Sequence, residues 1–373
     1  MIELKDVTKY YEGQKNPAVK NLTLAVEEGE TCVFVGPSGC GKSTTLRMIN
    51  RLIDPTSGEI LINGENIKDK DPDRLRMSIG YVIQQIGLLP HRTVAENVAI
   101  VPRLYGWPKE DINQRVDELL ELVGLDIATT KDKYPSQLSG GQMQRVGVAR
   151  AMAADPPIML MDEPFGAVDP IIRNYLQDEF LRLQKEMRKT ICFVTHDINE
   201  AIKMGDKIVI FKEGELIQHG TPHDILTKPI NKFVSDFIGY DRVIKMLSLY
   251  KVRRLSYPVQ CTVGKEELAD AIKKMNDLDA EICFVVNDDG GACGFIAAKD
   301  VLKAGGDLSV DQLEDMVHRN RDSFIDDMAY MRDALSLMLE LDTDYLGVLD
   351  SGGLAGFISL ENIRLHSCKK EGV

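Results

Sequence analysis

The sequence contains no apolar run that approaches the roughly 20 residues needed to cross a bilayer. It also has no excess of basic residues, because 45 Lys and Arg stand against 58 Asp and Glu. The resulting net charge of -13 argues against a general nucleic-acid-binding surface, which would normally be basic. The seven cysteines are scattered and form no CxxC pair, which disfavours a disulfide framework or a zinc site.

Reduced thiols are typical of the cytosol, and the charged opening residues 1–6 do not resemble a signal peptide. We therefore expect a cytosolic protein that serves a membrane, if at all, through a partner. A chain of 373 residues with 44% hydrophobic residues is long enough for two or three domains, each with its own core.

A glycine-rich turn is the strongest motif in the first half of the chain. The apolar residues 31–35 precede it and the helix-like residues 45–52 follow it, which is the order that a phosphate-binding P-loop requires. Its backbone N–H groups and the helix N-terminus would bind phosphate, Lys42 would reach the outer phosphates, and Ser43 would bind Mg²⁺. The candidate cofactor-binding residues of this loop are Gly36, Pro37, Ser38, Gly39, Cys40, Gly41, Lys42, Ser43 and Thr44.

An acidic pair follows the apolar run 158–161. Strand-like and helical segments alternate in this region, which predicts a parallel sheet with ligands at the carboxyl ends of its strands. Asp162 should therefore hold Mg²⁺, usually through water, beside the P-loop. Glu163 is positioned to orient and polarise an attacking water.

A second phosphate-ready helix N-terminus lies in the segment 138–145, which reads Leu-Ser-Gly-Gly-Gln-Met-Gln-Arg. One chain already has a P-loop for its own nucleotide. The second site is most economically explained if it completes the nucleotide site of another molecule. The residues expected to do so are Ser139, Gly140, Gly141 and Gln142.

Together these motifs resemble the ATP-binding cassette (ABC) ATPases over residues 1–240. The resemblance implies an α/β P-loop NTPase cassette with a mixed sheet core, an antiparallel β subdomain and a helical subdomain. It implies that Tyr11 stacks on adenine, with Tyr10 a less well aligned candidate. It further implies that Gln84 contacts Mg²⁺ and the transport partner, that Asp169 crosses the dimer interface, and that His196 contacts the γ-phosphate.

The mechanism implied by the resemblance is a head-to-tail homodimer that closes around two ATP molecules. Lys42, Mg²⁺ and His196 would stabilise the developing charge while Glu163 acts on water, and hydrolysis would then open the dimer. The movement between the closed and open dimer would be transmitted to the protein that contacts the Gln84 region.

Two function classes remain for such a motor: a transport ATPase on a membrane complex, and a soluble ATPase acting on DNA or ribosomes. Lys42 and Ser139 are 97 residues apart, which leaves no room for a long coiled-coil insertion, and the chain holds one cassette. With the acidic charge, this speaks against DNA or ribosomes as the target, and the family resemblance, which carries most of the weight, favours the importer motor. The segments 80–91 and 161–170 are similar to glycine betaine/carnitine/choline (osmoprotectant) importer ATPases, although another amino acid or amine importer is an alternative.

Members of that importer family act with membrane permease subunits and, indirectly, an extracytoplasmic solute-binding protein. The resemblance therefore implies a peripheral position on the cytoplasmic face of the membrane, with no nucleic acid as partner.

An internal repeat with an offset of 62 to 63 residues follows residue 240. Residues 255–370 resemble a tandem cystathionine-β-synthase (CBS) pair of the α+β class, joined to the cassette by an expected linker at 241–254. This pair would regulate activity by sensing an adenine nucleotide, a cyclic dinucleotide or ionic strength, or would only hold two cassettes together. Each copy keeps half of the family's ligand-anchoring pair: the first has Ala297 and Asp300, the second Ser359 and Asn362.

A basic cluster of Lys251, Arg253 and Arg254 lies in the expected linker. We expect it to be a solvated surface, with contact to anionic lipid as the alternative.

Overall fold

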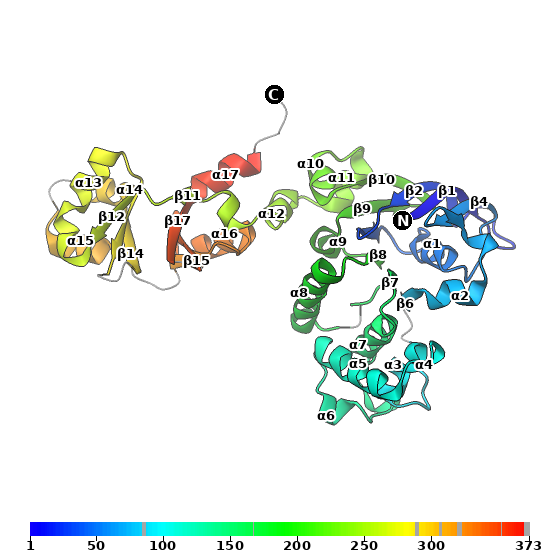
Figure 1. Ribbon diagram of the computed structural model, residues 1–373. Coiled ribbons are helices and arrows are strands. Elements are labelled where there is room, and N and C mark those ends of the chain that lie inside the picture. Colours follow the sequence, from blue (N-terminus) through cyan, green and yellow to red (C-terminus); the bar gives the residue numbers. More distant parts are fainter. Residues whose placement is uncertain are drawn as a thin grey trace. The chain divides into compact units, whose positions relative to one another are not determined.

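The computed structural model describes residues 1–83, 87–166, 168–287, 291–305, 308–318, 323–351 and 353–368. The chain divides into two compact units, Met1–Gly239 and Tyr240–Val373 (Figure 1). Each unit encloses its own hydrophobic clusters.

A mixed sheet forms the centre of the first unit. Its strand order is β10-β9-β3-β8-β7-β6, and neighbouring strands are parallel except for the antiparallel pair β9 and β10. β3, β7 and β8 are buried along their whole length, so they occur as continuous apolar runs in the sequence. The strands are β3 (Thr31–Val35), β6 (Ile79–Val82), β7 (Ile158–Asp162), β8 (Thr190–Thr195), β9 (Lys207–Lys212) and β10 (Glu215–Gly220).

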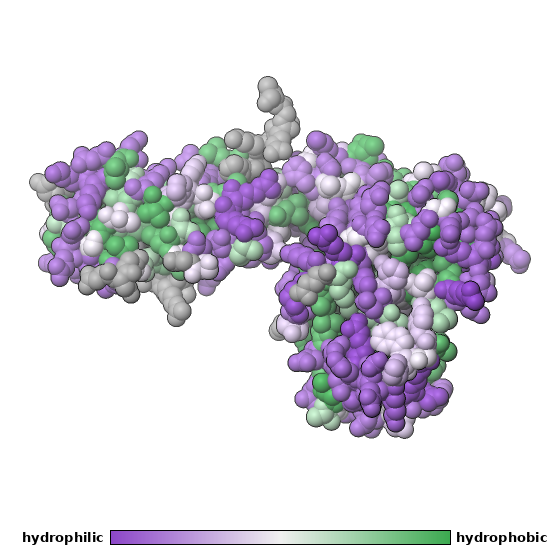
Figure 2. Space-filling view, in the orientation of Figure 1, coloured by the Kyte–Doolittle hydropathy of each residue, from purple (hydrophilic) through white to green (hydrophobic). Residues whose placement is uncertain are grey.

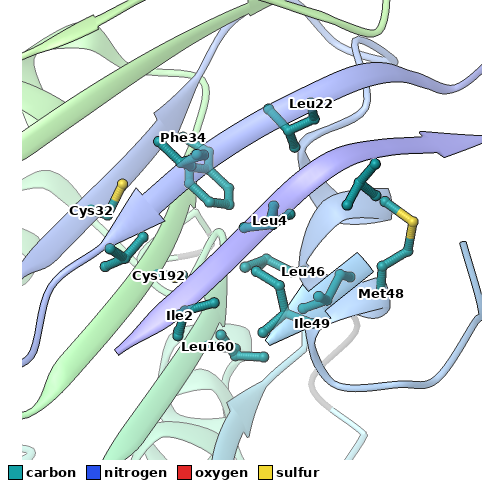
Figure 3. Close-up of a cluster of buried hydrophobic side chains, with 14 of the residues drawn as sticks. Ile2, Leu4, Leu22, Cys32, Phe34, Leu46, Met48, Ile49, Leu160 and Cys192 are labelled. Carbon is teal, nitrogen blue, oxygen red and sulfur yellow. The ribbon is translucent and has the colours of Figure 1, made fainter. Parts of the chain in front are cut away.

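A second, antiparallel sheet of the first unit has the order β2-β1-β4-β5. The buried apolar residues of β1 and β2 share one hydrophobic cluster with α1 (Lys42–Ile49) and the mixed sheet. Figure 3 shows Leu4 beside Leu46 and Ile49 in this cluster. The strands are β1 (Ile2–Lys9), β2 (Val19–Val26), β4 (Ser57–Ile62) and β5 (Glu65–Asn66).

Helices gather below the mixed sheet in Figure 1 and form the helical part of the first unit. The longest of them, α5, buries Ile112, Val116, Leu119 and Leu120, which recur at helical spacing. The elements of this part are α3 (Val94–Val98), α4 (Ile100–Leu104), α5 (Lys109–Leu122), α6 (Ile127–Thr130), η2 (Pro135–Gln137) and α7 (Gly140–Met152). The remaining helices are η1 (Ile67–Asp69), α2 (Pro72–Met77), α8 (Pro170–Met187), α9 (Ile198–Met204), α10 (Pro222–Thr227) and α11 (Lys232–Ile238).

The second unit consists of two repeats with the same strand pattern, one parallel and one antiparallel pairing in each. Phe284 and Phe295 of the first repeat share a buried cluster with Phe357 of the second, so the two repeats pack as a pair. The first repeat contains β12 (Cys261–Gly264), η4 (Lys265–Asp270), α13 (Ala271–Leu278), β13 (Ile282–Val286), β14 (Ala292–Ala297), α14 (Ala298–Ala304) and α15 (Val310–Met316). The second contains β15 (Phe324–Asp326), α16 (Met331–Glu340), β16 (Tyr345–Asp350), β17 (Gly353–Ser359) and α17 (Leu360–Cys368), with β11 (Tyr257–Pro258) paired to β17.

Residues 241–254 differ from the expected linker. They contain α12 (Arg242–Leu247) and η3 (Val252–Arg254), and Leu247 and Val252 are 3% and 0% exposed in the core of the second repeat. The segment therefore belongs to the second unit, because its apolar side chains are buried there.

In the basic cluster of this segment, Arg253 and Arg254 are exposed and Lys251 is half-buried. The ammonium of Lys251 lies 3.3 Å from the ring centroid of Tyr330, and the guanidinium of Arg254 lies 4.7 Å from that of Tyr250. Two of the three cations are thus held by cation–π contacts.

On the face drawn in Figure 2, hydrophilic residues cover most of the surface and hydrophobic residues form small separate patches. Within the described ranges, no helix combines the length and the apolar character needed to span a membrane.

Candidate active site

The loop between β3 and α1 is closed around the side chain of Lys42. This side chain is 6% exposed, and its ammonium donates to the carbonyl oxygens of Gly36 and Pro37 at 2.8 and 2.9 Å. Gly41 precedes α1 with a φ of 102°, and a Cβ there would lie 2.3 Å from the carbonyl oxygen of Ala18. The chain therefore takes a path that only glycine allows, and the N–H groups of the first turn of α1 remain available for an anion.

Ser43 and Asp162 meet at the start of α1 and the end of β7. The Ser43 hydroxyl donates to Asp162 Oδ1 at 2.8 Å, and Asp162 is 2% exposed. Burial raises the pKa of Asp162, although the hydrogen bond from Ser43 opposes this shift. A hydroxyl and a carboxylate are the oxygen ligands that Mg²⁺ prefers, and phosphate oxygens and water can complete its coordination. The pair therefore fits a magnesium–nucleotide complex.

Glu163 and His196 are brought together from the ends of the neighbouring strands β7 and β8. His196 Nδ1 lies 3.3 Å from Glu163 Oε1, and His196 is exposed while Glu163 is half-buried. Glu163 has a φ of 51°, a left-handed conformation held by the bond from its N–H to the Val194 carbonyl oxygen at 3.0 Å. The carboxylate and the imidazole thus share one edge of the sheet with Asp162 and are accessible to a substrate.

A cavity of about 640 Å³ adjoins the P-loop, with Tyr11, Gly39 and Thr44 in its wall. An aromatic ring beside a phosphate-binding loop is suited to stacking on a nucleotide base. Tyr10 is absent from this wall, and its N–H donates to Thr56 Oγ1 at 2.9 Å. Tyr11, the tyrosine that the sequence favoured, therefore lies beside the P-loop, and its stacking on adenine stays a prediction.

The segment from Ser139 to Gln142 begins α7 with a reciprocal capping box. The Gln142 N–H donates to Ser139 Oγ at 3.2 Å, and the Ser139 N–H donates to Gln142 Oε1 at 2.9 Å. Gly140 is exposed and Gly141 is half-buried. No hydrogen bond or ion pair joins Ser139–Gln142 to residues 36–44 within the described part of the chain.

Asp169, a further predicted residue, lies outside this cluster of contacts. Asp169 is the N-cap of α8, and its Oδ1 accepts from the Ile172 N–H at 3.1 Å. Gln84 lies outside the described residues.

Gln144 joins the site although the sequence motifs did not single it out. Its side chain is 5% exposed, and its Nε2 donates to the carbonyl oxygen of Glu163 at 2.6 Å. It thereby connects α7 to the backbone turn that presents the Glu163 carboxylate. A glutamine on the otherwise apolar buried face of α7 was the available signal.

Comparisons with known proteins agree with this arrangement. Residues 19–166 match the ABC transporter family, and residues 252–307 match the CBS domain. The chain is 45% identical to the osmoprotectant import ATP-binding protein OsmV of Salmonella typhimurium, over 95% of this chain and 92% of that protein. It is 46% identical to the choline transport ATP-binding protein OpuBA of Bacillus subtilis, over 94% of this chain and 91% of that protein.

Solved structures match the first unit. A dimeric structure of MJ0796, a bacterial ABC transporter cassette, is 40% identical, with a TM-score of 0.56 over 60% of this chain and 99% of that one. A dimeric structure of the same cassette bound to ADP and Pi, in a post-hydrolysis state, is 39% identical with the same TM-score.

These matches confirm the predicted fold class, an ABC ATPase cassette followed by a CBS region, and with it ATP hydrolysis coupled to transport. The identity extends through both units, because it covers about 95% of the chain. The chain belongs to the family of ABC transporter ATP-binding proteins whose members include the osmoprotectant and choline import proteins named above.

Proposed function

We propose that this protein is the ATP-hydrolysing motor of an importer for quaternary amine osmoprotectants such as glycine betaine, carnitine and choline. The observation that carries this proposal is the 44 to 46% identity to three proteins named for import of such solutes, over at least 94% of the chain. An importer of another amino acid or amine is the alternative, because an ATP-binding subunit does not itself bind the solute.

In the proposed reaction, the Glu163 carboxylate orients a water molecule toward the γ-phosphate and draws its proton. His196, 3.3 Å from Glu163, and the Lys42 ammonium stabilise the charge that develops on the phosphate oxygens. Mg²⁺, held beside Ser43 and Asp162, would neutralise charge on the phosphates. Gln84 is proposed as a further contact of the metal and of the transport partner.

The nucleotide site is proposed to be completed by a second copy of the chain. The exposed N-terminus of α7, with Ser139, Gly140, Gly141 and Gln142, would contact the γ-phosphate bound to the partner's P-loop. The dimeric cassette structures support this assembly. Closure on ATP and opening after hydrolysis would drive membrane permease subunits, with an extracytoplasmic solute-binding protein as the indirect partner.

The second unit is proposed to regulate this motor. It contains a cavity of about 780 Å³, and the polar residues in its wall include Lys299, Asp344 and Arg364. This size and mixed charge would suit an adenine nucleotide or a cyclic dinucleotide. The alternative is a dimerisation module, because two of the expected anchors are already paired: Ser359 Oγ donates to Asn362 Oδ1 at 2.6 Å.

Solute uptake tests the transport proposal. In its host cell, deletion of the gene should abolish uptake of labelled glycine betaine, carnitine or choline at high osmolarity, and the wild-type gene should restore it while Glu163→Gln should not. Uptake of an unrelated amino acid serves as the control. Unchanged uptake of all three amines, with loss of the amino acid, would select the alternative importer.

Calorimetric titration tests the regulatory proposal separately. AMP and a cyclic dinucleotide are added to the full chain and to Arg364→Gln. Binding that the substitution weakens supports a ligand site, and no heat with either ligand leaves only the dimerisation module.

A further inference from the structure

Glu200, in the first turn of α9, connects three elements close to the candidate active site. Its Oε2 accepts from the Thr195 hydroxyl at 2.6 Å, and its Oε1 accepts from Gln177 Nε2 of α8 at 3.2 Å. Thr195 and Gln177 are each 2% exposed, so neither can exchange this partner freely for water. One carboxylate thus holds the end of β8, the start of α9 and the middle of α8.

The Thr195 side of this network leads directly to His196. Thr195 Oγ1, while donating to Glu200, also accepts from the Asp197 N–H at 3.1 Å. The hydroxyl therefore fixes the backbone on both sides of His196, whose Nδ1 lies 3.3 Å from Glu163 Oε1. Thr195 keeps this orientation, donating to one side and accepting from the other, only if the Glu200 carboxylate stays in place.

The α8 side leads to the turn before that helix. Arg173 of α8 donates from its side-chain Nη2 to the Val168 carbonyl oxygen at 2.8 Å. Its backbone N–H donates to the Asp169 carbonyl oxygen, also at 2.8 Å. Arg173 also attracts the Glu200 carboxylate electrostatically. A shift of α8 would therefore move the backbone at Asp169 as well as the Gln177 donor of Glu200.

We propose that Glu200 is a positioning residue for ATP hydrolysis, whose carboxylate holds the turn carrying His196 against α8 through Thr195 and Gln177. The inference rests on the proposed role of His196 at the γ-phosphate. A carboxylate suits this position because it accepts from both donors at once, whereas a glutamine side chain has one acceptor oxygen, and its NH₂ group could be satisfied only if the Gln177 amide turned over.

A purely structural role would be to hold α9 against α8, and the chain offers a control for it. Lys203 of α9 forms a 2.8 Å ion pair with Asp178 of α8, farther along the same two helices. Lys203→Gln removes a link between the helices without touching Thr195 or His196.

The test compares ATP hydrolysis by the full-length wild type, Glu200→Gln, Lys203→Gln and the double variant Glu200→Gln/Gln177→Glu, with melting temperatures to show that each is folded. We expect Glu200→Gln to lower kcat about tenfold with KM for MgATP changed less than about twofold, because orientation rather than binding is lost. The double variant restores a carboxylate–amide pair and should recover most of kcat. Lys203→Gln should hydrolyse ATP like the wild type.

Thr195→Val provides a second route if Glu200→Gln does not fold, and it should lower kcat in the same way. Wild-type kcat in Glu200→Gln or in Thr195→Val would overturn the inference, as would an equal loss in Lys203→Gln. A wild-type protein without any ATPase activity would instead overturn the proposed function together with this inference.

Discussion

The Ser43 hydroxyl donates to the Asp162 carboxylate at 2.8 Å and so joins the first turn of α1 to the end of β7. These residues are 119 positions apart in the sequence, and the parallel sheet brings them to one edge. This hydrogen bond satisfies a carboxylate that is 2% exposed, but it does not offset the cost of burying the charge.

Replacing Asp162 should stabilise the free protein while abolishing Mg²⁺-dependent hydrolysis. Burial raises the pKa of Asp162, so the ionised carboxylate destabilises the folded state at pH values above that raised pKa. Asp162→Asn should therefore gain about 1 kcal/mol in free energy of unfolding at pH 8 without nucleotide. The gain should vanish as the pH falls below the ordinary carboxyl range, where both folded and unfolded states carry a protonated Asp162.

Denaturant unfolding at pH 8 and in acid measures this difference. Asp126→Asn is the opposite-sign control, because the bond from Thr129 lowers the pKa of Asp126 and the substitution should not stabilise the protein. A destabilised Asp162→Asn at pH 8 would contradict the predicted cost of this buried charge.

Glu163→Gln should retain ATP binding and lose nearly all turnover, because an amide cannot take the proton of the attacking water. The variant should then accumulate as an ATP-bound dimer on a size-exclusion column, while the wild type returns to monomer after hydrolysis. Glu179→Gln, at a half-buried carboxylate of α8 that pairs with Arg182, is a control that should behave like the wild type. Full hydrolysis by Glu163→Gln would remove Glu163 from the reaction.

Tyr11→Ala should weaken ATP binding about tenfold with little effect on kcat. Tyr11 lines the cavity beside Gly39 and Thr44, and stacking of a base on an aromatic ring contributes about 1 to 3 kcal/mol. Tyr10→Ala is the matched control, since Tyr10 is absent from the wall of that cavity. The KM for ATP of both variants is the measurement, and a larger effect of Tyr10→Ala would reverse the assignment.

Gly41→Ala should be much more destabilising than Gly39→Ala, although both glycines lie in the P-loop with positive φ. A Cβ on Gly41 would lie 2.3 Å from the Ala18 carbonyl oxygen, whereas a Cβ on Gly39 would meet no atom within 4 Å. We expect a loss of about 3 kcal/mol or more for Gly41→Ala, from clash and backbone strain together. Gly39→Ala should lose about 1 kcal/mol from backbone strain alone, and thermal unfolding of both variants compares them.

The sequence was sufficient where the chemistry is local. The P-loop and the capped start of α7 are short segments whose glycines, serine and glutamine act on their own or adjacent backbone, so their spacing already specifies the conformation. A strand that is buried along its whole length can likewise be predicted, because it occurs as a continuous apolar run, as β7 does. The repeat after residue 240 could also be predicted from the sequence, because each copy contains the same short order of helix, strand and turn.

Contacts between distant segments were decided only by tertiary structure. The sequence placed Glu163 and His196 in order along the chain, but only the packing of β7 against β8 brings their side chains to 3.3 Å. The sequence also predicted a linker at residues 241–254, because the apolar residues of this segment do not by themselves show which core buries them. Glu200 is an example of such a contact between distant segments. Its partners come from β8 and α8, and only the packing of those elements puts both donors within reach of one carboxylate.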